Sequence, residues 1–217
     1  MSLTYPLDIL ADWPGWTTSF DLLWRQEQSR QANGVTRVKD FGEPLWRMTA
    51  STRSLSRPEL DHWRARLNAL ENGIKTFKGY PLSRCYPIAY PRGTWPTGAA
   101  FDGVSATVYS IGADNKSLAV DMLPAGFVFS VGDFISVAYS AGTKFALLQV
   151  METATASGAG VTPEFEVRPH LPIGLAVDDV VSVRRPHCLM TLVPGSVASE
   201  SEDNGRGKIS FSAVEYR

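Results

Sequence analysis

The chain has 217 residues, of which 44% are hydrophobic and 20% are charged. These shares are close to ordinary globular usage, so we expect an ordered protein with one large domain or two small ones. No apolar run approaches the roughly 20 residues that cross a bilayer. The first ten residues lack the basic and apolar regions of a signal peptide. We therefore expect no membrane insertion and a protein that stays in the cytoplasm of the cell that makes it.

The charges are divided unevenly between the two halves of the chain. Residues 1–95 contain 13 Lys or Arg and 9 Asp or Glu, whereas residues 96–217 contain 8 and 13. This asymmetry is too mild for nucleic-acid binding, which needs a concentrated basic surface. It favours head-to-tail contacts between copies of the chain, because opposite potentials steer association. An accident of surface composition explains it equally well.

The two cysteines, Cys85 and Cys188, lie far apart, and neither belongs to a C-x-x-C pair. The sequence therefore gives no support for a zinc cluster or a redox motif. A disulfide would need an oxidising compartment. We expect two free thiols.

The first predicted elements are strands around a tight turn. Phe20, Leu22 and Trp24 fall at alternate positions, which is typical of a strand with one aromatic-rich face. Asn33 and Gly34 both tolerate positive φ, so this pair predicts the turn of a hairpin.

Residues 45–51 form the next predicted strand. One face of this strand carries Trp46, Met48 and Ala50. A further strand is expected over residues 74–80. Residues 81–103 are rich in Pro and Gly, which predicts a linker or extended surface segment and a domain boundary near residue 95.

A helix over residues 56–72 is the clearest element in the sequence. Ser56 and Glu59 have the spacing of a capping box, in which each side chain satisfies an amide of the first turn. Pro58 lies in that turn, where a missing N–H does no harm. Gly73 is the expected C-terminal cap, because glycine adopts the left-handed conformation easily. One apolar stripe along the helix is formed by Leu60, Trp63, Leu67 and Leu70.

The second half is predicted to be almost entirely β. Turn residues separate eight strand candidates at short intervals, which is typical of a sandwich or a barrel. The candidates are residues 105–111, 117–120, 134–139, 145–153, 164–168, 179–184, 188–193 and 208–216. Residues 200–207 are polar and Gly-containing, which indicates an exposed hairpin tip. We expect a mainly β (α+β) protein: a ring-forming β-sandwich or split barrel over 1–95 with one helix, then an OB-like or galectin-like β-barrel over 96–217.

The histidines give little sign of catalysis or metal binding. His62 lies within the predicted helix and is expected to be a surface or packing residue. His170 and His187 each adjoin a proline in β-rich segments, and Cys188 follows directly. Neighbouring strand residues point to opposite faces, so His187 and Cys188 are poorly placed to bind one metal ion. We predict no metal site.

Paired carboxylates are the other candidates for chemistry. Glu164 and Glu166 share a strand face, and Asp178 and Asp179 lie at a turn. A glycosidase needs two carboxyl groups on either side of a sugar, whereas acidic residues beside turns are usually solvated. The Gly-x-Gly at 158–160 does not join a strand to a helix, so phosphate binding is not indicated. We predict no catalytic residue and no cofactor.

Aromatic side chains in the second half could stack on single-stranded nucleic acid. The candidates are Phe127, Phe129, Phe134 and Tyr139. That half is net acidic and would repel a phosphate backbone. Core packing is the better explanation, and no nucleic-acid binding is expected.

Five of the six tryptophans lie in the first 63 residues. Some of these must pack under the helix, whereas Trp13 and Trp16 flank a Pro-Gly turn and are candidates for exposure. Exposed aromatic side chains are enriched at protein–protein contacts. We therefore predict that Trp13, Trp16 and Trp24 contribute to an oligomer interface.

The order of elements over the first half resembles distal tail proteins of long-tailed bacteriophages and gene transfer agents. The match covers hairpin, strand, capped helix and exit strand, and includes Gly73, Phe77, Gly79 and Tyr80. The second half is similar to the β-barrel that decorates such rings. The resemblance implies a virion protein assembled in the host cytoplasm. It implies a ring, often six-fold, that joins the tail tube protein to the tail-tip hub.

Three alternatives stay open at this point. The chain could be a carbohydrate-binding module for attachment to the host surface, with the barrel holding glycans through exposed rings. It could be a small cell-wall hydrolase, which the missing nucleophile and base disfavour. It could also be another minor tail-tip protein.

Overall fold

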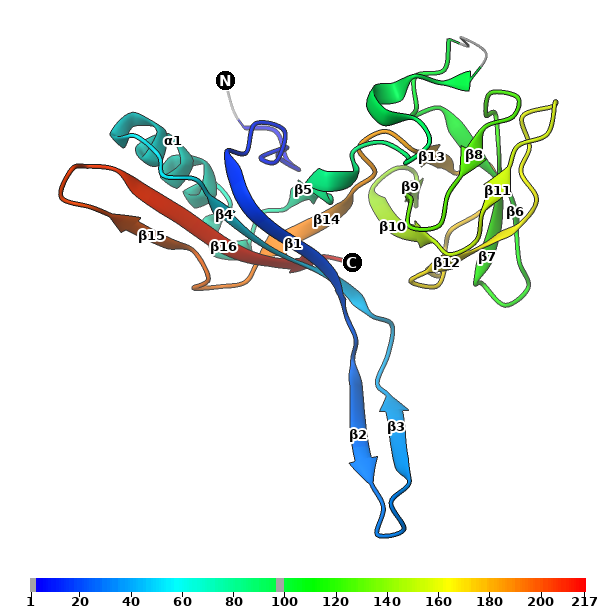
Figure 1. The fold of residues 1–217 in the computed structure, drawn as a ribbon, viewed down its shortest axis with the longest axis horizontal. Coiled ribbons are helices and arrows are strands. Elements are labelled where there is room, and N and C mark those ends of the chain that lie inside the picture. Colours follow the sequence, from blue (N-terminus) through cyan, green and yellow to red (C-terminus); the bar gives the residue numbers. More distant parts are fainter. Residues whose placement is uncertain (1–2, 97–99) are drawn as a thin grey trace.

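The computed structural model describes residues 3–96 and 100–217, and for Trp16 it describes the backbone alone. The protein is mainly β with one α-helix and a closed barrel, which confirms the predicted fold class. Figure 1 shows the barrel beside an open sheet that carries the helix, with a long hairpin projecting away from both.

The open sheet is antiparallel and has the strand order β1-β4-β16-β14-β5. A sixth strand, β15, pairs with the first half of β16. The bounds are β1 Gly15–Leu23, β4 Leu45–Thr52, β5 Phe77–Gly79, β14 Cys188–Leu192, β15 Ala198–Ser201 and β16 Gly207–Glu215. Helix α1 (Arg57–Asn68) packs against β16, so one face of the sheet is covered.

The covered face of the sheet holds the first hydrophobic core. Strand β4 alternates as predicted, with Trp46, Met48 and Ala50 buried. The predicted helical stripe packs into the same core, which confirms it: Leu60, Trp63, Leu67 and Leu70 are all buried. The opposite face of the sheet is polar, and its Ser and Thr side chains remain partly exposed.

The predicted N-terminal cap of the helix is confirmed. The Ser56 backbone N–H donates to Glu59 Oε2 at 2.9 Å, and the Ser56 hydroxyl donates to the same oxygen at 2.8 Å. Arg53 forms an ion pair with the other oxygen of Glu59 at 2.8 Å. These donors lower the pKa of Glu59 to about 2, the Ser56 backbone hydrogen bond being the largest cause.

The predicted C-terminal end of the helix is wrong by four residues. The α-helix ends at Asn68, and a short 3₁₀ turn, η1 (Glu71–Gly73), follows it. The Ala69 carbonyl, which a longer helix would use, accepts from the Tyr5 hydroxyl at 2.7 Å. Gly73 does adopt a positive φ of 104°, but as the last residue of η1. A Cβ there would come within 2.5 Å of the Leu192 carbonyl oxygen.

The closed barrel has six strands in the order β10-β12-β7-β6-β13-β9. Their bounds are β6 Ala106–Ile111, β7 Ser117–Asp121, β9 Phe134–Tyr139, β10 Lys144–Val150, β12 Phe165–Arg168 and β13 Val180–Ser182. A two-stranded sheet of β8 (Val128–Phe129) and β11 (Ala154–Thr155) lies beside it. The aromatic candidates Phe127, Phe129, Phe134 and Tyr139 are buried, which confirms the core-packing explanation.

The predicted C-terminal boundaries need a correction. Residues 188–215 were assigned to the barrel, but β14, β15 and β16 belong to the open sheet with β4 and β5. The barrel is thus inserted between β5 and β14. Long-range strand pairing decides this arrangement, and local patterns carry no signal for it. The exposed tip predicted over residues 200–207 is confirmed as the end of the β15–β16 hairpin.

The Pro-rich segment after β5 packs onto the barrel. It contains the short turns η2 (Leu82–Arg84) and η3 (Pro91–Gly93). The Tyr90 ring lies 4.7 Å from that of Phe127, and the Tyr90 hydroxyl accepts from the Val128 N–H at 2.8 Å. Trp95 and Phe101 pack against the same core. The segment therefore closes one side of the barrel core.

Candidate assembly surface and polar pocket

The hairpin of β2 (Gln26–Arg30) and β3 (Thr36–Asp40) lies at the surface, and every residue of both strands is exposed. Figure 1 shows this hairpin projecting well beyond the sheet and the barrel. Its turn forms as the sequence predicted: the Val35 N–H donates to Asn33 Oδ1 at 3.1 Å, and Gly34 has a φ of 83°.

Four large apolar side chains lie along the hairpin and at its base with about half their surface exposed: Trp24 (51%), Val35 (50%), Val38 (53%) and Phe41 (51%). Residues 24–41 carry four basic and two acidic side chains. One of the cations, Lys39, lies over the Phe41 ring with Nζ 5.3 Å from its centroid. The hairpin is therefore an apolar and basic arm, the composition expected of a surface that docks on an acidic partner.

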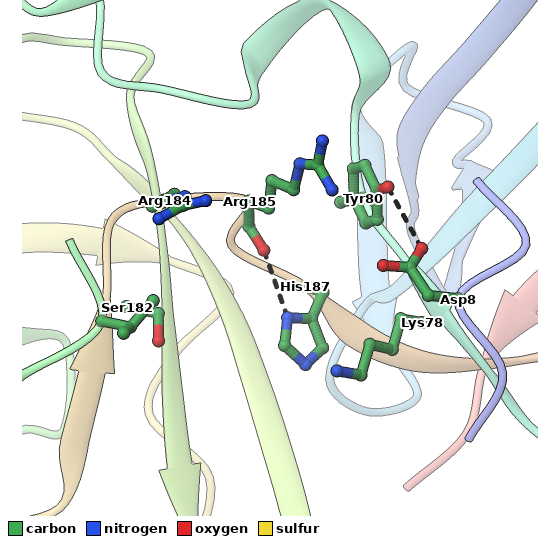
Figure 2. Close-up of a pocket in the computed structure, with 8 residues that line it drawn as sticks. Asp8, Lys78, Tyr80, Ser182, Arg184, Arg185 and His187 are labelled. Carbon is green, nitrogen blue, oxygen red and sulfur yellow. Dashed lines mark hydrogen bonds between the residues drawn. The ribbon is translucent and has the colours of Figure 1, made fainter. Parts of the chain in front are cut away.

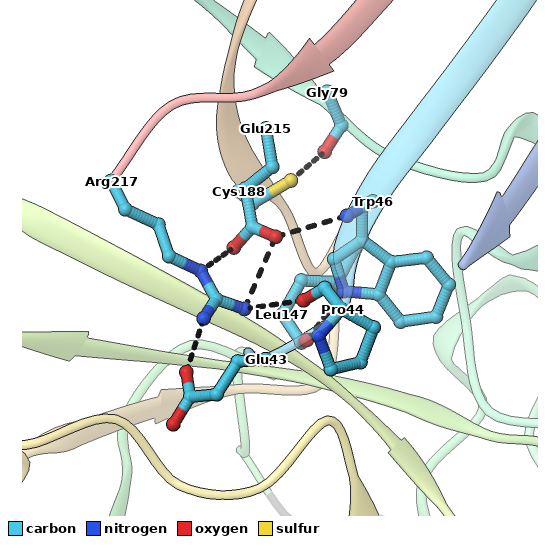
Figure 3. Close-up of polar contacts among 8 residues, drawn as sticks. All are labelled: Glu43, Pro44, Trp46, Gly79, Leu147, Cys188, Glu215 and Arg217. Carbon is cyan, nitrogen blue, oxygen red and sulfur yellow. Dashed lines mark hydrogen bonds and ion pairs between the residues drawn. The ribbon is translucent and has the colours of Figure 1, made fainter. Parts of the chain in front are cut away.

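The base of this arm is fixed by buried polar contacts, which Figure 3 shows. Glu215 is buried, and its Oε2 accepts from the Trp46 backbone N–H at 3.0 Å. Arg217 pairs with Glu215 at 3.1 Å and also with Glu43, and it donates to the Pro44 carbonyl at 3.1 Å. These contacts join the end of β16 to the residues that leave the hairpin. They anchor the segment that follows the arm to the end of β16.

The sheet also presents an open edge. Strand β1 pairs with β4 along one side, and no strand within residues 3–96 and 100–217 pairs with its other side. An unpaired edge of nine residues offers backbone donors and acceptors to another chain. It is a second surface through which copies could join.

The structure corrects one of the predicted interface residues. Trp13 is only 8% exposed, and its ring contacts those of Trp63 and Phe211 at 5.0 and 5.1 Å. It is a core residue of the single chain and cannot make the predicted contact between copies. The side chain of Trp16 lies outside the described residues. Trp24 is exposed as an interface residue would have to be.

A polar pocket of about 200 Å³ lies between the sheet and the barrel (Figure 2). The sheet and the N-terminal segment supply Asp8, Lys78, Tyr80 and His187, and the barrel with its return connection supplies Val104, Ser182, Arg184 and Arg185. The pocket was not predicted from the sequence, because its residues come from four separate segments with no motif spacing. The sequence signal that it does carry is a set of basic residues at both ends of the barrel insertion, Lys78 before it and Arg184 and Arg185 after it.

His187 forms part of the wall of this pocket. Its Nδ1 lies 3.2 Å from the Arg185 carbonyl oxygen, and its ring packs on Phe145 with centroids 4.7 Å apart. Burial lowers the pKa of His187. The adjacent Cys188 is fully buried, and its Sγ donates to the Gly79 carbonyl at 3.8 Å. His187 therefore lines the pocket, whereas Cys188 belongs to the first hydrophobic core.

The carboxylates considered for catalysis are bound to different partners. Glu164 accepts from the hydroxyls of Ser110 and Ser117, at 2.9 and 3.3 Å. Glu166 forms an ion pair with Arg168.

Asp179 accepts from the Ala176 N–H at 2.8 Å, and the neighbouring Asp178 is exposed with a φ of 70°. His62 packs edge-on against Trp63, and His170 is exposed. Within the described ranges, no three His, Cys, Asp or Glu side chains are placed to hold a metal ion.

No protein-family model matches this sequence, and the search of curated proteins finds no match either. In the part of the chain that the structure describes, no helix has the length and apolar character needed to span a bilayer.

Proposed function

We propose that the protein is a structural component of a bacteriophage tail tip, a distal tail protein whose copies form a ring between the tail tube and the tail-tip hub. It acts by assembly and not by catalysis. The observation that carries the proposal is the arm of residues 24–41, which projects from the fold, is apolar and basic, and lies outside both cores.

The energetics of such an arm favour a partner. A two-stranded hairpin alone is marginally stable in water, because too little apolar surface is buried to offset the ordering of its backbone. Val38 and Phe41 keep half their surface exposed in the single chain. Burying them against another surface would stabilise the hairpin by about 25 cal/mol for each Å² of apolar area removed from water. The arm is thus incomplete in isolation.

The charge distribution indicates another copy of the chain as the partner. The arm carries Arg25, Arg30, Arg37 and Lys39 against Glu27 and Asp40. Residues 96–185 carry nine acidic and five basic side chains. A basic arm on one copy and an acidic barrel region on the next would give a head-to-tail contact. Such contacts close into a ring when the rotation between neighbouring copies divides a full turn evenly. Pairing of the open β1 edge would add backbone hydrogen bonds to that contact.

The experiment combines sedimentation velocity with electron microscopy of the full chain. The wild type should form a concentration-dependent oligomer that appears as a closed ring. The double variant Val38→Asp/Phe41→Asp should weaken association at least about tenfold, or about 1.4 kcal/mol. Its melting temperature should stay near that of the wild type, because both side chains lie outside the cores.

Ile74 supplies the matched control, because it is apolar and 75% exposed but lies outside the arm, the β1 edge and the acidic barrel region. Ile74→Asp should leave the oligomer unchanged. A wild type that stays monomeric at high concentration, or an Ile74→Asp variant that loses the oligomer as fully as the arm variant, would contradict the proposal.

A second candidate function is glycan binding at the base of the arm. Trp24 lines a pocket of about 290 Å³ with Asp40, Glu43, Arg168 and His170. An exposed indole flanked by polar side chains can stack on a sugar ring while hydrogen bonds fix its hydroxyl groups. Glycan-array binding by the full chain that disappears in Trp24→Ala would favour this function. If the full chain binds no glycan on the array, this second candidate function is wrong.

A further inference from the structure

The polar pocket between the sheet and the barrel concentrates positive charge without neutralising it. Lys78, Arg184 and Arg185 all line it, and within residues 3–96 and 100–217 none of the three forms an ion pair. Among the described residues, Asp8 is the one carboxylate that lines it. The pocket thus holds an excess of two positive charges.

We propose that this pocket is a binding site for a small multivalent oxyanion, with inorganic phosphate as the simplest example. The site goes beyond the proposed assembly function and does not depend on it. The expected ligand is a compact anionic group with several acceptor oxygens.

The side chains of the pocket are matched to such a ligand. Two guanidinium groups and one ammonium group provide many N–H donors and no acceptor, and donors of this kind form short charge-assisted bonds to phosphate oxygens. The Ser182 hydroxyl adds a neutral group that can donate. An apolar ligand would leave these donors without partners, and a cation would be repelled by them.

The donors come from both sides of the pocket. Figure 2 shows Lys78 on the side of the sheet and the two arginines on the connection that returns from the barrel. His187 contacts the Arg185 carbonyl at 3.2 Å and so fixes the backbone next to both guanidinium groups.

The carboxylate of Asp8 is held by hydrogen bonds on one side of the pocket (Figure 2). Asp8 Oδ1 accepts from the Tyr80 hydroxyl and from the Ala11 N–H, each at 3.2 Å. Those contacts hold its charge against the sheet side of the pocket. Within the part of the chain that the structure describes, the guanidinium groups of Arg184 and Arg185 remain without a carboxylate partner and can bind an anion.

A bound oxyanion would connect the two parts of the fold. Lys78 belongs to β5 of the sheet, whereas Ser182 belongs to β13 of the barrel. An anion that contacts both sides binds only when the sheet and the barrel keep this arrangement. Phosphate should therefore raise the unfolding temperature of the whole chain by mass action.

The test is calorimetric titration of the full chain with phosphate. The ionic strength is kept constant by lowering the chloride concentration as the phosphate concentration rises. We expect saturable binding with one site. Arg184→Ala and Lys78→Gln remove a donor from each side, and each should weaken binding about tenfold or more. Circular dichroism and melting in chloride identify a variant that has failed to fold. Arg184 is exposed, so its variant should keep the wild-type melting temperature.

Lys208 is the matched control, because it is an exposed lysine of β16 outside this pocket. Lys208→Ala should change phosphate affinity less than about twofold, which is the effect of one distant charge in salt. No saturable binding by the wild type up to about 10 mM phosphate would overturn the proposal. Equal weakening by Lys208→Ala and Arg184→Ala would overturn it too, since the effect would then be one of net charge.

Discussion

The indole N–H of Trp46 donates to the Leu147 carbonyl at 2.7 Å, across 101 residues of sequence and from the open sheet to the barrel. The bond is buried, and Trp46 also packs on Phe134 of the barrel with ring centroids 5.5 Å apart. The first core therefore includes two barrel residues, Phe134 and Leu147. Trp46 therefore joins the sheet to the barrel.

We expect Trp46→Phe to destabilise the whole chain. Phenylalanine keeps a buried ring but removes the N–H that donates to the Leu147 carbonyl. Losing this buried hydrogen bond should lower the free energy of unfolding by about 1–3 kcal/mol. The measurement is the free energy of unfolding from urea denaturation. Trp24→Phe is the control, because Trp24 is exposed. A loss below about 0.5 kcal/mol for Trp46→Phe would show that the bond contributes little.

The elements that the sequence predicted well are those fixed by local chemistry. The Ser56–Glu59 spacing placed the helix start correctly, since both partners lie within one turn. The alternation around Met48 placed the buried face of β4. The turn predicted at Asn33-Gly34 was also correct in place, because it is closed by contacts within residues 31–35, although Gly34 alone of the pair has positive φ.

The features that the sequence could not reveal depend on distant contacts. Strand β16 reads the same locally whether it closes a barrel or pairs with β4, so its true partner was missed. Trp13 was expected to be exposed beside a turn, but Phe211 and Trp63 enclose it from later segments. The projecting arm and the polar pocket were missed for the same reason. The arm is recognised by its distance from the rest of the fold, and the pocket by residues that come together from separate segments.

The pKa of Glu59 leads to an acid-dependence prediction. Because the folded pKa is about 2 and the ordinary value is 4.5, the carboxylate contributes stability above pH 4.5 that is lost as the pH falls toward 2. Glu59→Gln should lower the melting temperature at pH 7 and flatten the loss of stability between pH 4.5 and 2. Asp61→Asn, at an exposed position of the same helix, is the control and should keep the wild-type slope. Equal slopes for all three proteins would refute this account of the cap.

Trp13 gives a prediction that separates folding from assembly. Trp13→Ala should cost about 3–5 kcal/mol of unfolding free energy, because it leaves a cavity between α1 and β16. Trp13→Phe keeps one buried ring and leaves a smaller cavity, so it should cost less than Trp13→Ala. The indole N–H that it removes is buried and has no hydrogen-bond partner among residues 3–96 and 100–217, so its removal breaks no hydrogen bond there. Unfolding curves measure both, and sedimentation of the folded Trp13→Phe protein should show the wild-type oligomer. Loss of that oligomer with unchanged stability would return Trp13 to the interface.

His187 makes stability depend on pH near neutrality. Its pKa is lowered first by burial and further by Lys78, while the Arg185 carbonyl and Asp8 raise it by less. The neutral imidazole is therefore favoured in the folded chain. Its contribution is complete above the unfolded value of 6.5, and it is lost as the pH falls below 6.5 toward the lower folded pKa.

The wild type should accordingly lose stability between pH 7 and pH 5, at a rate of up to about 1.4 kcal/mol per pH unit for one proton. His187→Gln keeps a donor for the Arg185 carbonyl but does not titrate, so its melting temperature should vary less over this range. His170→Gln changes an exposed histidine and should retain the wild-type slope. If the His187→Gln and wild-type slopes coincide, burial at the pocket wall does not set the protonation of this imidazole. Added phosphate should raise the melting temperature of the His187→Gln protein as well, because the proposed anion contacts come from Lys78 and the arginines.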